Sequence, residues 1–271
     1  MAFPRWWLDP RFMETTDSLS IIDLVKNGTV DYRLAGMLWF LMEHRASLLV
    51  AAGPSYAGKT TLLHALLDFL RPEIQQVNLQ GYYEDFQFQN CCKPANTYLV
   101  TEEISNHMYE YLWGYQVIKA FKLLARGFAL GGTIHARTAK ETVYLLREKI
   151  GLPFDMIARL SIIVTLRALP GKTWEDEPIR RVETVSLINL VQEGLTVRLL
   201  AARYSPEEEL QYPAEEVLQE SIFQKLAIKN GRLSDEIAVR EKYLRQLGSE
   251  NIHSHDQVRQ AIVKFYEKSI M

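Results

Sequence analysis

Short apolar runs alternate with helical patterns along most of the chain. Five of these runs have the length of buried strands. Continuous apolar runs of this kind are typical of parallel strands that are covered on both faces. The pattern therefore predicts the α/β class, with a mostly parallel sheet and helices on its faces. The predicted strands are Ser47–Ala52, Ile74–Leu79, Thr97–Val100, Phe128–Ile134 and Ser161–Leu166.

The predicted helices lie before and between these strands. Asp17–Lys26 and Tyr32–Arg45 precede the first strand, and Lys59–Leu70 follows it after a glycine-containing turn. Tyr109–Arg126 and Thr138–Lys149 separate later strands. Strand, glycine turn and helix in this order predict the first unit of an α/β sheet.

The pattern changes after Leu166. Two further strands, Arg180–Leu190 and Thr196–Ala202, are separated by a few turn residues, which predicts an antiparallel hairpin. After a proline-containing break at Tyr204–Pro213, the rest of the chain has a helical pattern. We therefore expect an N-terminal helical segment at 1–46, a core at 47–204 and a C-terminal helical subdomain at 205–271.

Composition and charge exclude several classes of protein. The chain has 271 residues, of which 48% are hydrophobic and 24% charged, as in globular proteins. Its 31 basic and 33 acidic residues are nearly balanced, so nucleic acid is not an expected partner. Cys91 and Cys92 are adjacent and are the only cysteines, which excludes a disulfide framework. With no run of about 18 apolar residues, we expect a cytoplasmic protein.

The octapeptide GPSYAGKT carries the strongest chemical signal. It satisfies G-x-x-x-x-G-K-[ST], the phosphate-binding loop, and it lies between an apolar strand and a helix as that loop requires. Its glycines allow backbone N–H groups to surround phosphates, its lysine adds a charge, and its threonine offers a hydroxyl to Mg²⁺. We predict binding of ATP and Mg²⁺ through Gly53, Pro54, Ser55, Tyr56, Ala57, Gly58, Lys59, Thr60 and Thr61.

Two further strand ends carry polar side chains. Glu102 and Glu103 end an apolar strand, where a carboxylate can bind Mg²⁺ through water or orient an attacking water. Acidic residues at a strand end are also common without any such role. His135 ends a later strand, at the edge where ligands bind in parallel sheets. We take Glu102, Glu103 and His135 as candidate catalytic residues, with Thr60 and Glu102 as candidate metal ligands.

In this order and spacing, these elements resemble the secretion-ATPase superfamily, the motor ATPases of type II and type IV secretion, type IV pili and archaeal flagella. ASLLVAAGPSYAGKTTLLHALLDFL is similar to its Walker A segment, and ARGFALGGTIHARTAKETVYLL to its histidine box. GLPFDMIARLSIIVTLRAL, followed by RRVETVSLI, is similar to its later core. The resemblance covers about Leu19–Ala202.

The resemblance implies a RecA-like core and an ATPase that drives conformational change in a secretion or pilus machine. Lys59, Thr60 and Thr61 take the Walker A roles, Glu103 matches the Walker B glutamate, and His135 matches the histidine-box residue. Members form homohexameric rings that act with inner-membrane components. A homohexamer, or a partner subunit, is therefore expected here, peripheral to the inner membrane.

The sequence departs from this family in three ways. The phosphate loop begins at Gly53, so we expect the usual N-terminal domain to be nearly absent. Gln80 aligns with a catalytic glutamate, for which Glu84 or Asp85 are possible shifted acids. No arginine occurs between Pro72 and Ala125, where members carry arginines that reach a neighbouring subunit. The possible substitutes are Arg126, Arg137, Arg159 and Arg167.

These departures leave alternatives to a hydrolysing motor. A degenerate regulatory subunit could bind ATP as a switch with little or no turnover, because a neutral Gln80 cannot accept a proton near neutral pH. A small-molecule kinase would also carry a phosphate loop. It would need an arginine-rich lid and an acceptor pocket, and the sequence indicates neither.

Overall fold

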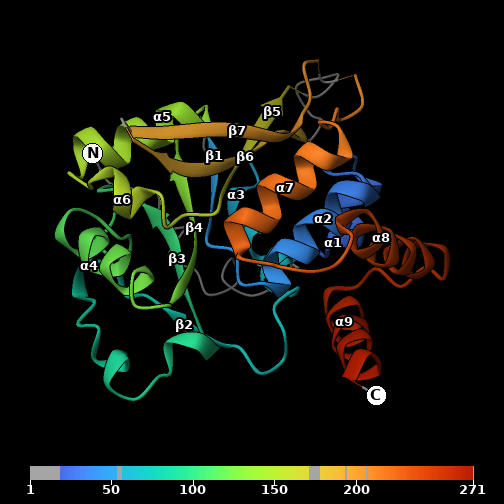
Figure 1. Ribbon diagram of the computed structural model, residues 1–271, viewed down its shortest axis with the longest axis horizontal. Coiled ribbons are helices and arrows are strands. Elements are labelled where there is room, and N and C mark those ends of the chain that lie inside the picture. The colour runs from blue at the N-terminus through green and yellow to red at the C-terminus, as the bar shows by residue number, and fades with distance from the viewer. Residues whose placement is uncertain (1–18, 54–56, 171–177, 193, 206, 271) are drawn as a thin grey trace, which may run out of the picture.

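The strands form one sheet in a computed structural model that describes residues 19–53, 57–170, 178–192, 194–205 and 207–270 (Figure 1). Within those residues the strand order is β2-β3-β4-β1-β5-β6-β7. The five strands from β2 to β5 pair in parallel, and β6 and β7 extend the sheet antiparallel. This confirms the predicted α/β class. The strands are β1 (Leu48–Ala52), β2 (Gln75–Asn78), β3 (Thr97–Ile104), β4 (Ala129–His135), β5 (Ile162–Leu169), β6 (Ile179–Val191) and β7 (Gly194–Ala202).

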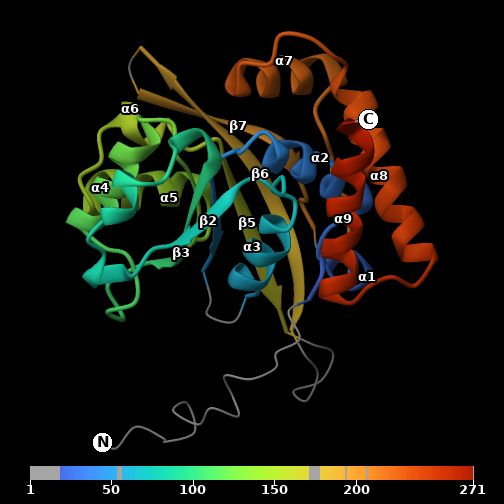
Figure 2. The same ribbon diagram turned by 90° about the horizontal axis from the view of Figure 1, so that it is seen from below.

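Helices cover both faces of the sheet (Figure 2). One face carries α4 (Tyr115–Leu124), α5 (Ala139–Tyr144) and α6 (Phe154–Ile157), with a π-helical turn at Leu145–Lys149. The other carries the remaining described helices, as in Figure 2. These are α1 (Ile21–Lys26), α2 (Tyr32–Glu43), α3 (Lys59–Leu67), α7 (Glu215–Leu226), α8 (Leu233–Ser249) and α9 (His255–Ile270).

Side chains of β1 alternate between the two layers, because successive residues of a strand point to opposite faces. Leu48 and Val50 belong to the core shared with α1–α3 and the C-terminal helices, whereas Leu49 and Ala51 belong to the core shared with α4–α6. All five residues of β1 are buried. A strand buried on both faces has to be apolar at every position, which explains the continuous run in the sequence.

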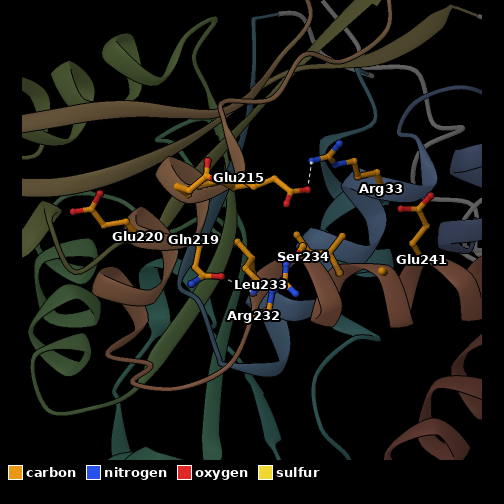
Figure 3. A pocket seen from close by; sticks show the side chains of 12 residues that line it. Arg33, Glu215, Gln219, Glu220, Arg232, Leu233, Ser234 and Glu241 are labelled. Atoms are coloured by element: carbon orange, nitrogen blue, oxygen red, sulfur yellow. Dashed lines mark hydrogen bonds and ion pairs between the residues drawn. The ribbon is translucent and has the colours of Figure 1, made fainter.

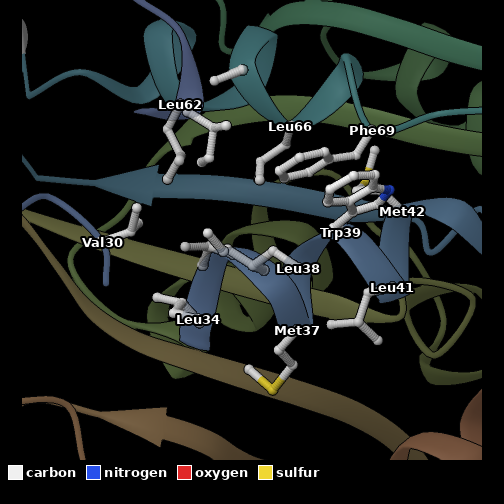
Figure 4. Packing of buried hydrophobic residues seen from close by; sticks show 14 of the residues in the cluster. Val30, Leu34, Met37, Leu38, Trp39, Leu41, Met42, Leu62, Leu66 and Phe69 are labelled. Carbon is white, nitrogen blue, oxygen red and sulfur yellow. The ribbon is translucent and has the colours of Figure 1, made fainter. Parts of the chain in front are cut away.

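The C-terminal helices share their core with α2. Trp39 of α2 is fully buried and stacks on Phe69, with ring centroids 5.0 Å apart (Figure 4). Its indole Nε1 donates to the Tyr266 hydroxyl of α9 at 2.7 Å, and Arg240 of α8 forms an ion pair with Glu43 at the end of α2. These helices thus pack in one layer with α2. The division into domains at 46 and 204 stays a prediction.

Two predicted helices begin later than the sequence pattern indicates. α1 begins at Ile21 because Ser20 and Asp23 form a capping box. α4 begins at Tyr115 rather than Tyr109, since the preceding loop turns back onto β3 through a Leu112 N–H bond to the Glu103 carbonyl.

No helix in the described part of the chain is both long and apolar enough to cross a membrane.

Candidate active site

The phosphate loop joins β1 to α3 at the carboxyl edge of the sheet. β1 ends at Ala52 and α3 begins at Lys59, so the N–H groups of the first helical turn face the loop. Gly58, at the N-cap of α3, has a φ of +85°, a left-handed conformation that glycine adopts without strain. Three of the predicted binding residues, Pro54, Ser55 and Tyr56, lie outside the described residues.

His135 reaches this loop through the sheet register. β1 and β4 pair in parallel with Ala52 opposite His135, so the two strands end side by side. The imidazole Nδ1 lies 3.4 Å from the carbonyl oxygen of Gly53, the first residue of the loop. His135 therefore lies beside the first residue of the phosphate loop, and its catalytic role stays a prediction.

A β-bulge sets the direction of the two glutamates. On β3, Thr101 pairs with Gly132 and Ile104 with Ile134, so three steps on one strand match two on the other. The irregularity falls on Glu102 and Glu103, and bulges commonly re-aim side chains near functional sites. The Glu102 side chain is 54% exposed, whereas that of Glu103 is 11% exposed.

Glu103 pairs with the histidine and interacts electrostatically with the lysine of the phosphate loop. Its Oε2 is 3.1 Å from His135 Nε2, and its Oε1 is buried without a hydrogen-bond partner among the described residues. Burial lowers the pKa of Lys59, and attraction by Glu103 partly raises it again. A buried carboxylate oxygen without a partner can be completed by a water or a metal-bound water.

Glu102 has a different neighbour, His64 on α3. Glu102 Oε1 is 3.4 Å from His64 Nε2. The hydrogen bond lowers the pKa of Glu102 and raises the pKa of His64, because it favours the charged form of each. Thr60 is exposed and Thr61 is half-buried in the first turn of α3. Glu103 thus interacts with His135 and with Lys59. Glu102 instead contacts His64, a residue that the sequence did not single out.

Two arginines lie against the glycines of the phosphate loop. A Cβ built on Gly53 would be 2.7 Å from Arg137 Cγ, and one built on Gly58 would be 3.0 Å from Arg180 Cδ. Arg137 was one of four possible substitutes for the missing arginines, but Arg180 was not, because it reads as the start of a strand. Arg167 pairs with Glu183 and lines a cavity together with Gly53 and Arg137. The other two lie elsewhere, because Arg126 bonds Gln89 and Arg159 lies near Lys225.

Glu84 lies in the loop after β2, where its carboxylate binds backbone N–H groups. Its Oε2 accepts the Gln80 N–H at 2.8 Å and its Oε1 accepts the Phe86 N–H at 2.7 Å. Asp85 similarly accepts the Gln87 N–H at 2.9 Å. The Glu84 carboxylate is buried and shapes this loop with both of its oxygens. The contacts of both carboxylate oxygens give Glu84 a structural role in this loop, whereas the sequence offered it as a possible shifted acid.

A cavity of about 420 Å³ adjoins the loop on the side of α1 and β6. Its volume is within the range of small-ligand sites. Apolar, amide and cationic groups line it, among them Leu24, Asn27, Gly58, Thr61 and Arg180.

A separate cavity of about 510 Å³ lies between α2, α7 and α8 (Figure 3). Arg33 and Arg232 line it together with Glu215 and Glu241, and none of the described residues of the phosphate loop does so. It is therefore not part of the candidate active site.

No known protein-family model matches this chain. One uncharacterized protein of Methanocaldococcus jannaschii is 22% identical, with 83% of this chain and 90% of the relative covered. A second from the same organism is also 22% identical, with 93% of this chain covered, and the chain spans half of that relative's length.

Among the solved structures to which the chain is similar are ATPases of secretion and pilus machines, the superfamily that its motifs resemble. The VirB11 ATPase of the Brucella suis type IV secretion system has a TM-score of 0.38, 14% identity, and coverage of 69% of this chain and 66% of its own. The pilus retraction motor PilT with bound ADP has a TM-score of 0.37 and 16% identity, with 89% of this chain and 62% of its own covered. The Legionella pneumophila ATPase DotB has a TM-score of 0.35 and 10% identity, with 83% of this chain and 63% of its own covered. With TM-scores below 0.5, these likenesses add no weight to a functional conclusion, and the chain spans less than two thirds of each structure.

Proposed function

We propose that this protein binds ATP with Mg²⁺ and hydrolyses it at the carboxyl edge of the sheet. The observation that carries the proposal is the buried Lys59 at the start of α3, together with His135, which lies 3.4 Å from the Gly53 carbonyl oxygen and 3.1 Å from the Glu103 carboxylate. A phosphate loop that opens a helix supplies N–H donors and a positive dipole end for phosphates. The adjoining cavity would receive the base and sugar.

Each residue has a role in this proposal. Lys59 neutralises the β- and γ-phosphates, and the Thr60 hydroxyl, a hard oxygen ligand of the kind Mg²⁺ prefers, would bind the ion. The free Oε1 of Glu103 orients the attacking water and accepts its proton. His135 lies between Glu103 and the loop, where it responds to the γ-phosphate. Glu102 at the rim would reach the ion through water.

The turnover would drive conformational change in a secretion or pilus machine, in line with the sequence resemblance. On this proposal the chain acts in the cytoplasm, as a homohexamer or with a partner subunit, against inner-membrane components. Arg137 and Arg180, next to Gly53 and Gly58, would supply the positive charge that the segment from Pro72 to Ala125 lacks.

The K59A variant tests nucleotide binding. A fluorescent ATP analogue should bind the wild type and lose at least about tenfold in affinity in K59A, because a charge-assisted contact to phosphate is removed. Lys122 is an exposed lysine on α4, so K122A is the matched control and should bind as the wild type does. Equal affinity in K59A and the wild type would refute the site.

A second measurement separates the motor from a regulatory subunit. Gln80 on the loop after β2 cannot accept a proton, which is the observation that favours the regulatory alternative. Steady-state ATP hydrolysis should exceed that of K59A if Glu103 serves as the base. Tight ATP binding with no hydrolysis above the K59A background would instead support an ATP-bound regulator.

A further inference from the structure

Three side chains with metal-binding atoms converge next to the phosphate loop. Glu103 ends β3, His135 ends β4, and His107 lies on the loop that follows β3. One ligand atom from each lies within 4.8 Å of the other two. We propose that Glu103, His107 and His135 form a binding site for a divalent transition metal of the zinc type, separate from any Mg²⁺ held by a nucleotide.

The geometry of two members is already close to that of metal ligands. His135 Nε2 and Glu103 Oε2 are 3.1 Å apart, and the rings of His107 and His135 have centroids 5.9 Å apart. Ligand bonds of about 2.0–2.2 Å bring neighbouring ligand atoms to roughly 3.5 Å in a tetrahedral site. The His107 side chain, which is exposed, needs a shift of only about 1 Å to complete the set.

The contacts around the three side chains are those expected of a metal site. Glu103 Oε1 is buried and has no hydrogen-bond partner among the described residues, so a second carboxylate oxygen is available to the ion. His135 Nδ1 faces the Gly53 carbonyl oxygen at 3.4 Å. Metal-binding histidines usually donate the other ring N–H to such a carbonyl, which directs the free nitrogen to the ion.

The loop that carries His107 closes back onto the end of β3 at Leu112. Leu112 N–H donates to the Glu103 carbonyl at 2.9 Å, and Ser105 N–H donates to the Leu112 carbonyl at 3.2 Å. These bonds hold His107 over the end of β3 and near Glu103. The short loop thus brings its side chain back to a residue four positions earlier in the sequence.

The ligand set selects the class of metal. Two imidazole nitrogens and one carboxylate suit zinc, cobalt or nickel, whereas Mg²⁺ prefers oxygen ligands and keeps most of its waters. Two histidines with one glutamate, plus water, is a known zinc arrangement. The Lys59 ammonium, which interacts electrostatically with Glu103, opposes binding through its charge, so we expect a regulatory affinity rather than a permanently filled site.

Occupancy would have a consequence for catalysis. An ion on Glu103 and His135 removes the carboxylate that orients water, so zinc would inhibit turnover; this part rests on the proposed function. The binding of metal itself does not, since the three side chains are in place without nucleotide.

Cobalt absorption in nucleotide-free protein tests the site. Co²⁺ bound to three protein ligands has visible bands much stronger than those of the aqueous ion. Cysteine thiolates are also metal ligands, so the whole series carries C91S and C92S to remove the two free cysteines. In buffer with Mg²⁺, the parent protein should bind one equivalent of Co²⁺, and Zn²⁺ should bleach the bands.

Matched histidine variants identify the ligands. H107A should weaken Co²⁺ binding at least about tenfold, because a lost ligand costs no less than a lost supporting contact. His253 is a partly exposed histidine that contacts Asp23 far from the cluster, and H253A should bind as the parent does. Parent protein without bands, or H107A with parental affinity, would overturn the proposal. Neither result depends on ATP, so K59A in the ATP-binding test can fail or succeed independently.

Discussion

Glu102 and Glu103 are adjacent in the sequence and have different surroundings in the structure. The bulge in β3 buries Glu103 beside His135 and leaves Glu102 at the rim beside His64. A buried carboxylate with an unpartnered oxygen is costly unless a water, ion or substrate completes it. Glu103 is therefore the stronger candidate for the water-orienting residue.

Replacing Glu103 by glutamine separates binding from chemistry. E103Q keeps the shape and removes the base, so it should bind ATP and lose most of its hydrolysis, on the order of the 10²–10⁴-fold effect of general-base catalysis. Both are measured on one preparation, with E73Q as a control at the exposed Glu73. Wild-type turnover in E103Q would assign the base elsewhere.

At the scale of elements, the Tyr266 hydroxyl of α9 links this helix to the buried core. Tyr266 accepts the Trp39 Nε1–H at 2.7 Å and donates to the Phe69 carbonyl at 2.6 Å. These bonds connect α9, α2 and the end of α3 in a region where Trp39 and Phe69 are fully buried. The C-terminal helices are thus fixed to the layer that carries the phosphate loop.

Y266F should destabilise the protein without removing apolar packing. It leaves the Trp39 indole N–H and the Phe69 carbonyl without this partner, and such losses cost about 1–3 kcal/mol each. The free energy of unfolding in urea measures the loss, and Y144F at the exposed Tyr144 is the control. Equal stability of Y266F and the wild type would mean that water replaces the hydroxyl there.

α7 is tied to the other layer by Lys225. Its Nζ donates to the carbonyl oxygens of Ala158 at 2.7 Å and Ile188 at 2.5 Å. Burial lowers the pKa of Lys225 to about 8, from 10.5. Between these two values the unfolded chain binds more protons than the folded chain, so the contribution of Lys225 to stability rises with pH across that window.

K225M removes this pH dependence. From pH 8 to pH 10.5, the free energy of unfolding of the wild type should rise by up to about 3 kcal/mol relative to K225M, because one pKa unit corresponds to about 1.4 kcal/mol. Denaturant unfolding at several pH values measures the difference. K229M, at an exposed lysine just after α7, should follow the wild type throughout. A constant gap between wild type and K225M would contradict the lowered pKa.

At the scale of the whole molecule, the candidate catalytic residues all lie at one edge of the sheet. Parallel strands end at the same edge, so β1, β3 and β4 deliver the loop, Glu103 and His135 together. Arg137 and Arg180 touch the loop itself. On the proposed function, a neighbouring subunit would be a further source of positive charge.

Activity should then depend on assembly. Hydrolysis per subunit should rise with protein concentration, in parallel with the mass measured by light scattering in the presence of ATP, because sites completed between subunits form only on association. A constant rate per subunit from a species of monomer mass would instead mean that each chain carries a complete site.

The elements and the phosphate loop follow from the sequence alone. Apolar runs buried on both faces, and a glycine turn that opens a helix, are local patterns, and the predicted β1, α3, β4 and β6 match the observed ones within a few residues. The resemblance to secretion ATPases also rests on local motifs. The order of the strands in the sheet does not follow from the sequence alone, because the alternation of strands and helices does not determine which strands pair.

Only the tertiary structure decided which side chains meet. The register of β1 and β4 set His135 beside Gly53, the bulge in β3 separated Glu102 from Glu103, and the loop after β3 returned His107 to them. Arg180 reached Gly58 from a strand far along the chain. Such contacts depend on pairing between distant segments, whereas periodicity and turn residues describe only a segment's own conformation.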